Sequence, residues 1–400
     1  MPAVYSAGNQ NVHLQRRVVI LAALEGGGYG TDANPSPVAN AILCNNTPEI
    51  EPTGEKITRD VVRATFTPMG HVIGAKQVKV TLKVEARGGV LSGGILTPAD
   101  WEPLMLACSM QKTVVRRLQR VGTTGNFQLG ETVTGSISGA TGVLYHLDDN
   151  TLVITGTTGG SQFQVGETVT GGVSHATTVL VEVDKGLEYK PLTAMPGSGA
   201  GSQPSCTIYF YMDRLLHKIV GCRGTWDLDA TVGKIPEFTF TMTGLWLDPG
   251  DVGALPAAVE TSVEPPLVMG IGAKIGTYNP SLTSLKLSVG NQVTARQDAN
   301  APQGIVELMV TGRQPTGSID PEVDLLANFN PWTMWEGATP AAIMATLGNV
   351  AGQRMRCRVD QGLYDAMKYN ARNGIDAYSL PFVPVDQTGS GDDEIRLTTF

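Results

Sequence analysis

The chain has 400 residues, a formal net charge of −8 and a sequence pI of about 5.2, and it is long enough to hold two or three domains. Its 48 glycines and 16% of charged residues exclude a coiled coil, and its frequent apolar runs argue against a disordered chain. An acidic surface repels phosphates, which argues against non-specific binding to nucleic acid. Many short runs of Val, Ile, Thr and Leu between glycines predict mainly β structure.

Neither a membrane span nor a secretory leader is predicted. Residues 16–24 imitate the charged start and apolar core of a signal peptide, but the run is short and Glu25 follows it, so we interpret it as a strand. The five cysteines are widely spaced and form no C-x-x-C pair, which favours reduced thiols in a protein made in a cytoplasm.

Residues 1–40 are predicted to form an N-terminal arm that is poorly ordered in a monomer, because they are rich in turn formers. The glycines of 26–30 continue into the Asn34–Pro37 segment, which cannot open a helix, so a phosphate-binding loop is not predicted.

The first β domain is predicted to combine residues 41–112 with 204–262. Within it, 77–85 alternates apolar and polar residues as a half-buried strand does. Thr97, Pro98 and Asp100 are typical of a helix start, and this helix would run to Cys108. Residues 206–222 are predicted to form a hairpin and 237–246 a further strand.

Residues 113–203 are predicted to be an inserted β domain, because they contain an internal repeat and end in a Gly/Ser-rich linker. The segments 127–141 and 163–177 share 11 identical residues in 15 positions. Each unit alternates Thr and Val beside glycines, which indicates a small β-hairpin.

Residues 263–400 are predicted to form a second β domain with the same order of elements as the first. Strands are expected at 282–290, 305–312 and 378–385, a hairpin at 343–359, and a capped helix at 320–326. In this reading 305–312 corresponds to 78–85, which predicts a duplicated domain.

No arrangement of residues points to catalysis, a metal or a cofactor. The five histidines lack metal-ligand spacing, and no G-x-S-x-G motif is present. The Asp148–Asp149 and Asp392–Glu394 runs are interpreted as turns, and Arg116, Arg117 and Arg120 as partners of acidic residues or as the neck of the insertion. Arg354, Arg356 and Arg358 alternate along one strand face, which fits either a solvated face or a row of intersubunit salt bridges.

Several segments resemble the tail tube proteins (major tail proteins) of long-tailed bacteriophages. The similar segments are Ala22–Glu25 with Tyr29–Asp32, Asn40–Leu43, Arg59–Arg63, Gly221–Thr225, Ala299–Gly304, Thr311–Arg313 and Gly391–Leu397. The resemblance covers roughly 1–110 and 204–400, and it is a diffuse pattern rather than a signature motif.

The resemblance implies β-sandwich domains, each with one helix, whose inner sheets join between subunits into a barrel of about 24 strands. Rings would stack into a tube that conducts DNA without binding it specifically, in a virion tail assembled in the host cytoplasm. Tape measure, tail terminator and tail tip proteins would be further partners, with no membrane anchor, cofactor or enzymatic activity. Part of the N-terminal arm or the loop around residues 59–74 is expected to reach a neighbouring ring.

If one chain carries two tube-like domains, three chains suffice for a pseudo-sixfold ring, and we favour this trimer over a hexamer. The lumen is expected to be mainly acidic so that DNA slides, with Glu85 and Glu307 as candidate lining residues. Lys79 and Lys83 share a strand face with Glu85, which weakens that assignment. A capsid decoration or host-attachment protein and a carboxylate-based hydrolase are the alternatives.

Overall fold

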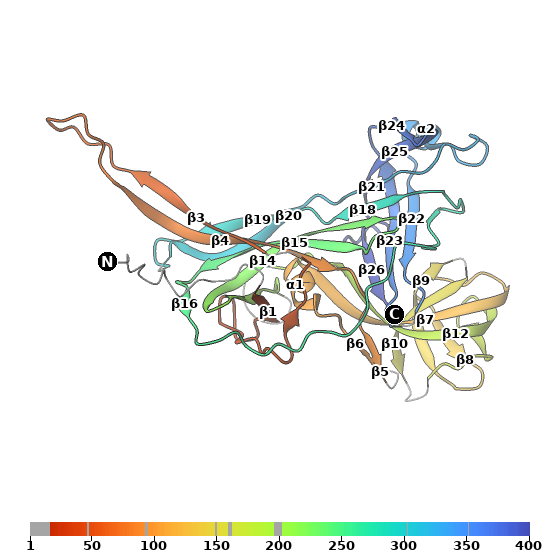
Figure 1. Ribbon diagram of the computed structural model, residues 1–400. Coiled ribbons are helices and arrows are strands. Elements are labelled where there is room, and N and C mark those ends of the chain that lie inside the picture. Colours follow the sequence, from red (N-terminus) through yellow and green to blue (C-terminus); the bar gives the residue numbers. More distant parts are fainter. Residues whose placement is uncertain are drawn as a thin grey trace, which may run out of the picture.

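The protein is an elongated β structure from which one long hairpin projects, as the computed structural model shows (Figure 1). The structure describes residues 17–45, 48–92, 95–148, 150–158, 162–195, 202–301, 303–350 and 352–400. Antiparallel strands dominate and both helices are short, so the prediction of a mainly β fold is confirmed.

The first domain is built from two layers that share the long strand β14. Its elements are β1 (Val18–Leu24), β2 (Ala41–Ile42), β3 (Glu49–Thr58), β4 (His71–Glu85), β5 (Val90–Ser92), β6 (Ile95–Thr97), α1 (Glu102–Ala107), β13 (Cys206–Met212), β14 (Leu215–Thr231), β15 (Glu237–Trp246) and β16 (Gly250–Asp251). The first half of β14 pairs with β13, which pairs with β1, and β14 also pairs along its length with β15, which pairs with β4. Alternate residues of β15, such as Phe238 and Phe240, are fully buried, because one face of this sheet covers the core.

Two sequence predictions for this domain are wrong. The arm was expected to reach residue 40, but β1 pairs along its whole length with β13 and buries Ile20 to 3% exposure, because its apolar residues belong to the core. Only residues 1–16 of that arm lie outside the described residues. The first helix begins at Glu102 rather than near Thr97, since Asp100 is held by Arg87 at 2.6 Å and by the amide of Leu43 at 3.2 Å.

The inserted residues form a module with a core of its own. Its strands are β7 (Met110–Thr124), β8 (Thr132–Gly135), β9 (Thr141–Asp148), β10 (Thr151–Thr158), β11 (Thr168–Gly171) and β12 (Thr177–Pro191). Phe127, Phe163 and Leu144 are buried in a cluster separate from the main core. The inner ends of β7 and β12 belong to the body, however, because Leu187–Tyr189 pairs with β26 and Tyr189 packs on Trp101. The boundary therefore lies inside these two strands rather than at 113 and 203.

The second domain repeats the arrangement of the first. Its elements are β17 (Lys274–Ile275), β18 (Ser284–Ser288), β19 (Asn291–Gln297), β20 (Ile305–Arg313), β21 (Thr316–Ile319), α2 (Pro331–Glu336), β22 (Ala341–Leu347), β23 (Met355–Tyr364), β24 (Lys368–Arg372), β25 (Ile375–Pro384) and β26 (Arg396–Thr399). The hairpin β22–β23 carries the same bulge as β13–β14, in which one residue on the first strand opposes two on the second.

The helix predicted at 320–326 is absent, and the six-residue helix α2 lies further along the chain. Asp320 accepts hydrogen bonds from the amides of Thr283 and Ser284, so its carboxylate ties the start of β18 to the end of β21 instead of capping a helix. The cap of α2 is Asn330, whose side chain accepts from the amide of Thr333.

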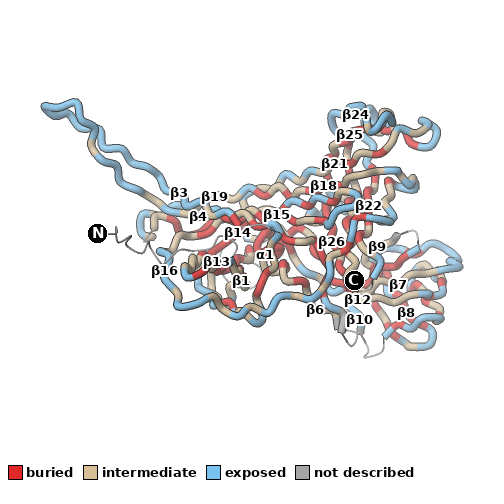
Figure 2. The backbone as a smooth tube through the Cα atoms, viewed as in Figure 1, coloured by how far each residue is buried: buried red, intermediate tan, exposed pale blue. Residues whose placement is uncertain are grey.

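One continuous sheet joins the two domains. The end of β14 pairs antiparallel with β18, so the order of strands is β3, β4, β15, β14, β18, β21, β25 and then β23 with β24. Buried residues concentrate along this sheet, whereas the outer half of the β3–β4 hairpin is largely exposed (Figure 2).

Candidate functional site

The described residues contain no group of three or more His, Cys, Asp and Glu side chains that could hold a metal ion. Among the same residues, no helix is long and apolar enough to cross a membrane. The surfaces and edges of the sheet carry the features that can contact other molecules.

The first such feature is the polar face of the continuous sheet. Residues that alternate with the core residues of β3, β4, β15, β14 and β18 point away from the core, and threonines fill much of this face. Its charged residues are Glu49, Glu51, Lys79, Lys83, Glu85, Asp227, Asp229, Glu237 and Lys286. Six carboxylates against three lysines make the face mildly acidic.

The two candidate lining residues have different environments. Glu85 lies on the polar face, but Arg87 binds its carboxylate at 2.8 Å and offsets its charge. Glu307 is only 4% exposed, and its carboxylate lies 3.4 Å from Arg223 and 3.1 Å from Arg296. Glu307 thus holds the β19–β20 hairpin on the first domain and presents little charge to solvent.

The second feature is the projecting β3–β4 hairpin, whose strands extend far beyond the sheet (Figure 1). Val62 and Phe66 near its tip are fully exposed, and Val72 is 56% exposed. Apolar side chains gathered on a projecting element indicate a contact surface for another protein.

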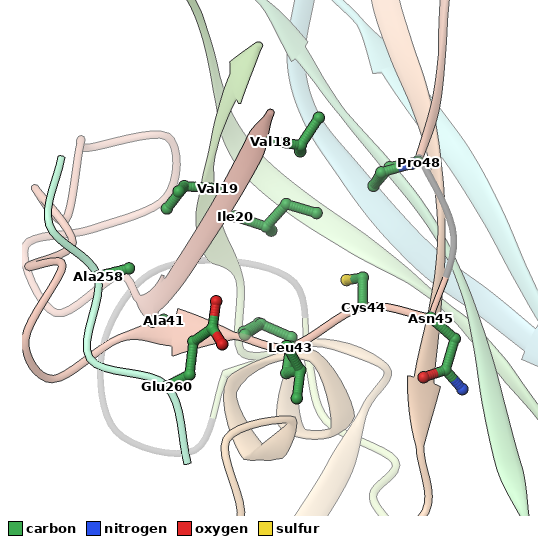
Figure 3. Close-up of a pocket in the computed structure, with 11 residues that line it drawn as sticks. Val18, Val19, Ile20, Ala41, Leu43, Cys44, Asn45, Pro48, Ala258 and Glu260 are labelled. Atoms are coloured by element: carbon green, nitrogen blue, oxygen red, sulfur yellow. The ribbon is translucent and has the colours of Figure 1, made fainter. Parts of the chain in front are cut away.

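The third feature is a cavity of about 560 Å³ beside the start of β3 (Figure 3). It lies between β1 and the segment that leads from β2 into β3. Val18, Ile20, Cys44 and Pro48 contribute to its wall.

Several segments that carry the family resemblance meet in one partly buried network. The carboxylate of Glu25 accepts hydrogen bonds from the amides of Gly30 at 2.8 Å and Gly221 at 2.7 Å. The Tyr29 hydroxyl donates to the carbonyl of Gly221 and accepts from the amide of Leu308, and burial raises the pKa of this phenol. The N-terminal motif therefore ties the β13–β14 hairpin of the first domain to β20 of the second.

Arg223 is the centre of this network and is completely buried. It donates to the backbone carbonyls of Pro204, Gln203 and Leu308 and lies over the Tyr29 ring, 4.8 Å from its centroid. Sequence reasoning missed this role, although the Gly221–Thr225 turn was among the quoted segments.

The arginine runs serve contacts within the chain. Arg117 pairs with Asp184 at 3.3 Å at the neck of the module, which agrees with the interpretation of that run. Arg354 contacts Glu182 and Asp184, and its guanidinium and that of Arg356 lie over the Phe400 ring. The row thus binds partners within the chain, with Arg354 on the inserted module, Arg356 on Phe400 and Arg358 on Asp360, which is neither of the two alternatives predicted for it.

The fold and these surfaces define a β-rich structural protein. A model of the phage tail tube protein family matches residues 15–395, so the chain belongs to the phage tail tube protein family. It is a component of the virion tail, and membership implies homo-oligomeric assembly into a tube with other tail proteins. No match was found among curated proteins. The predicted resemblance is confirmed, and the reading as a capsid decoration or host-attachment protein is not supported.

Proposed function

We propose that the chain polymerises into stacked rings that form the tail tube, the conduit through which DNA is ejected into the host cell. The observation that carries this proposal is the β14–β18 pairing, which joins the inner sheets of two similar domains within one chain. A ring of similar domains needs such a strand pairing at every boundary between domains. In a ring of two-domain chains, half of these boundaries lie within one chain and half lie between chains.

Three chains per ring follow from the same observation. Each chain contributes about eight strands to the continuous sheet, so three chains supply a barrel of about 24 strands with pseudo-sixfold symmetry. The count rests on two tube-like domains, one on each side of the β14–β18 joint, with the outer part of the inserted module on the outside, and the separate core of the module supports its exclusion from the count.

The mildly acidic polar face is the proposed wall of the lumen. A basic wall would hold DNA through many phosphate contacts, whereas Thr residues with a small excess of carboxylates let it slide. Of the two residues expected to line the channel, Glu85 lies on this face, and Asp227 and Asp229 join it there.

A cryo-EM map of tubes assembled from the purified chain tests symmetry and lumen together. Three chains per ring and a lumen formed by the polar face of β4, β15 and β14 are expected. Six chains per ring would overturn the trimer, and a lumen lined mainly by Lys and Arg would overturn the sliding mechanism.

The β3–β4 hairpin is the proposed contact between rings, because its exposed apolar tip lies beyond the sheet. Replacing residues 60–69 by a short Gly/Ser turn should leave folding unchanged but reduce stacking. Electron micrographs should then show single rings in place of tubes. Tubes of normal length from this variant would rule out the hairpin as the ring-to-ring contact.

A further inference from the structure

The continuous sheet ends in two unpaired strand edges. In the part of the chain that the structure describes, β3 pairs only with β4, and β24 pairs only with β25. Glu49 and Glu51 on β3 and Lys368–Ala371 on β24 are exposed. Exposed strand edges of this kind pair with other chains unless they are protected, so we expect each edge of this sheet to pair with a strand of another chain.

The joint inside the chain shows how two such edges fit. The end of β14 pairs with β18 so that Leu228 lies opposite Leu287 and Asp229 opposite Lys286. The two leucines are 1% and 3% exposed, and the charged pair on the other face lies 3.1 Å apart. The joint therefore combines a core contact on one face with an ion pair on the polar face.

The β3 edge corresponds to the β18 edge in this joint. In the second domain, the strands β18 and β19 together correspond to β3, and the strands β20 and β21 together correspond to β4. Both hairpins carry a bulge at the same place, beside Gly54 in the first and beside Gln292 in the second. When buried Leu82 of β4 is matched with buried Ile319 of β21, Ile50 takes the place of Leu287.

The β24 edge corresponds to the end of β14 in the same way. Leu228 lies opposite Phe238 on β15, and Tyr369 lies opposite Tyr378 on β25. Phe238 and Tyr378 are both buried against a tryptophan, with ring centroids 5.8 Å and 6.2 Å apart respectively. Tyr369 therefore takes the place of Leu228.

Resting on the proposed function, we propose that β24 of one subunit pairs antiparallel with β3 of the next subunit, with Tyr369 opposite Ile50 and Lys368 opposite Glu51 of that neighbour. The joint between chains would then repeat the joint within the chain. Lys368 and Glu51 carry opposite charges, and such pairs directly across a ladder stabilise it.

The exposure of Tyr369 supports this assignment. Its ring packs on Tyr378 and Trp332 on the core side of the sheet, yet 63% of the residue is exposed, whereas its counterpart Leu228 is 1% exposed. Ile50 of the neighbouring subunit would cover Tyr369 as Leu287 covers Leu228.

Two prolines make the β3 edge selective. Pro52 corresponds to Val289, whose amide donates to the carbonyl of Trp226 at 3.2 Å, and Pro48 corresponds to Leu285. Without these two amides, the outward edge of β3 between Pro48 and Pro52 offers a single donor, at Ile50, to an arbitrary strand. Its specificity would therefore come from side chains, which the Tyr369 and Lys368 contacts supply.

In the proposed pairing of β24 with β3, the β24–β25 turn of one subunit would lie at the cavity beside β3 of the next subunit. The β14–β15 turn seats on the second domain, where Val232 and Gly233 donate to the carbonyls of Thr283 and Val268, in the segments that lead into β18 and β17. The corresponding β24–β25 turn, which exposes Ile375, would seat on β1 and on the segment that leads into β3 of the neighbour. Val18 and Ile20 of β1, with Cys44 and Pro48 of that segment, line the cavity shown in Figure 3.

Disulfide trapping in assembled tubes tests the register. Asn370 and Glu49 are the counterparts of Asp229 and Lys286, so the double variant Asn370→Cys with Glu49→Cys should form disulfides between subunits, since opposed residues in a ladder lie within disulfide reach. On a non-reducing gel the products should end at a covalent trimer. The pair Asp229→Cys with Lys286→Cys should form its bond within one chain, and Asn370→Cys with Ile50→Cys, whose side chains point to opposite faces, should form none.

The outcomes separate this joint from the proposed function. Tubes that give no Asn370–Glu49 disulfide while the control pair within one chain does would overturn the register and leave the tube intact. A wild-type chain that forms no rings or tubes would overturn the proposed function itself. As a second measurement, Lys368→Glu should lower the assembled fraction roughly fivefold, and adding Glu51→Lys should restore it. Failure of this restoration would also count against the joint.

Discussion

Glu131 in the first repeat of the inserted module is clasped to Ser174 in the second repeat. Its carboxylate accepts hydrogen bonds from the Ser174 amide at 2.9 Å and from the Ser174 hydroxyl at 2.8 Å. Glu167 in the second repeat makes the same two contacts with Ser138 in the first. These reciprocal contacts, the clasp, explain the repeated sequence. Each repeat supplies a carboxylate that binds the other repeat and a serine-containing loop that the other repeat's carboxylate binds.

Replacing Glu131 by Gln should weaken the module by about 2 kcal/mol, because hydrogen bonds to a buried carboxylate are stronger than those to an amide. Burial alone would raise the pKa of Glu131, but the hydrogen bonds outweigh it and lower the pKa. Urea unfolding or limited proteolysis within the module measures the change. Glu55→Gln on the exposed part of β3 is the matched control and should have little effect. Equal stability of the two variants would show that the clasp is not important.

Arg223→Met should destabilise the protein by about 3 to 5 kcal/mol, because it leaves the buried Glu307 carboxylate without its buried partner. Arg296→Met removes the other partner of Glu307, but that side chain is 58% exposed, so its loss should cost less than about 1 kcal/mol. Adding Glu307→Gln to Arg223→Met should recover part of the loss, since the uncompensated charge is removed. Chemical unfolding of the wild type, Arg223→Met, Glu307→Gln and the double variant completes the cycle, and additive effects would contradict the coupling.

The positions of strands along the chain followed from the sequence wherever one face of a strand covers the core. The alternation in 237–246 is the clearest case, because β15 buries every second residue. Helix positions failed where a side chain had a stronger competing partner: Asp320 binds the amides that lead into β18, and Asp100 binds Arg87.

The site could not be predicted in the same way, because its contacts are non-local. Nothing in the sequence of residues 227–231 indicates that this segment pairs with 284–288. The two domains share a fold but not a sequence, since equivalent positions hold different residues, such as Leu228 in the first domain and Tyr369 in the second. The correspondence of 305–312 with 78–85 was wrong for this reason, since Leu82 occupies the place of Ile319. The correspondence between the two domains is visible only in the registers and bulges of their paired strands.

His146 should make the protein less stable as the pH falls from 7.5 to 5. Burial, together with the nearby Arg358 guanidinium, lowers its pKa to about 4, against the partial opposition of Asp360. In the unfolded chain the imidazole takes up its proton near pH 6.5, so between these values the unfolded state binds the extra proton and stability is lost. The loss attributable to His146 should be about 2 kcal/mol.

Urea midpoints at pH 7.5, 6 and 5 measure this effect, and His146→Gln should flatten the dependence in that window. The range above pH 5 separates the histidines from Glu131 and Glu167, whose lowered pKa values let them keep their stabilising charge until lower pH. Burial also lowers the pKa of His217, so only the part of the slope that His146→Gln removes belongs to His146. An unchanged slope in the variant would assign the pH dependence to other groups.

The inserted module should be removable if the cut respects the two shared strands. Arg117 and Asp184 lie opposite each other in the β7–β12 ladder, so replacing 118–183 by Asn-Gly closes a two-residue hairpin turn at that point. The inner strand ends that pair with β26 remain, and Tyr189 keeps its place against Trp101. The cost is the loss of contacts such as Tyr145 with Arg396 at 2.8 Å.

This excised chain should stay folded and should still assemble into tubes, because the two edges of the continuous sheet lie outside the deletion. A cut that removes 120–195 is the matched control. It takes away Leu187 and Tyr189, both buried in the main core, and should yield an insoluble chain. Size-exclusion chromatography and electron microscopy of both variants give the readout. Insolubility of the Asn-Gly variant would show that the body depends on the module for folding.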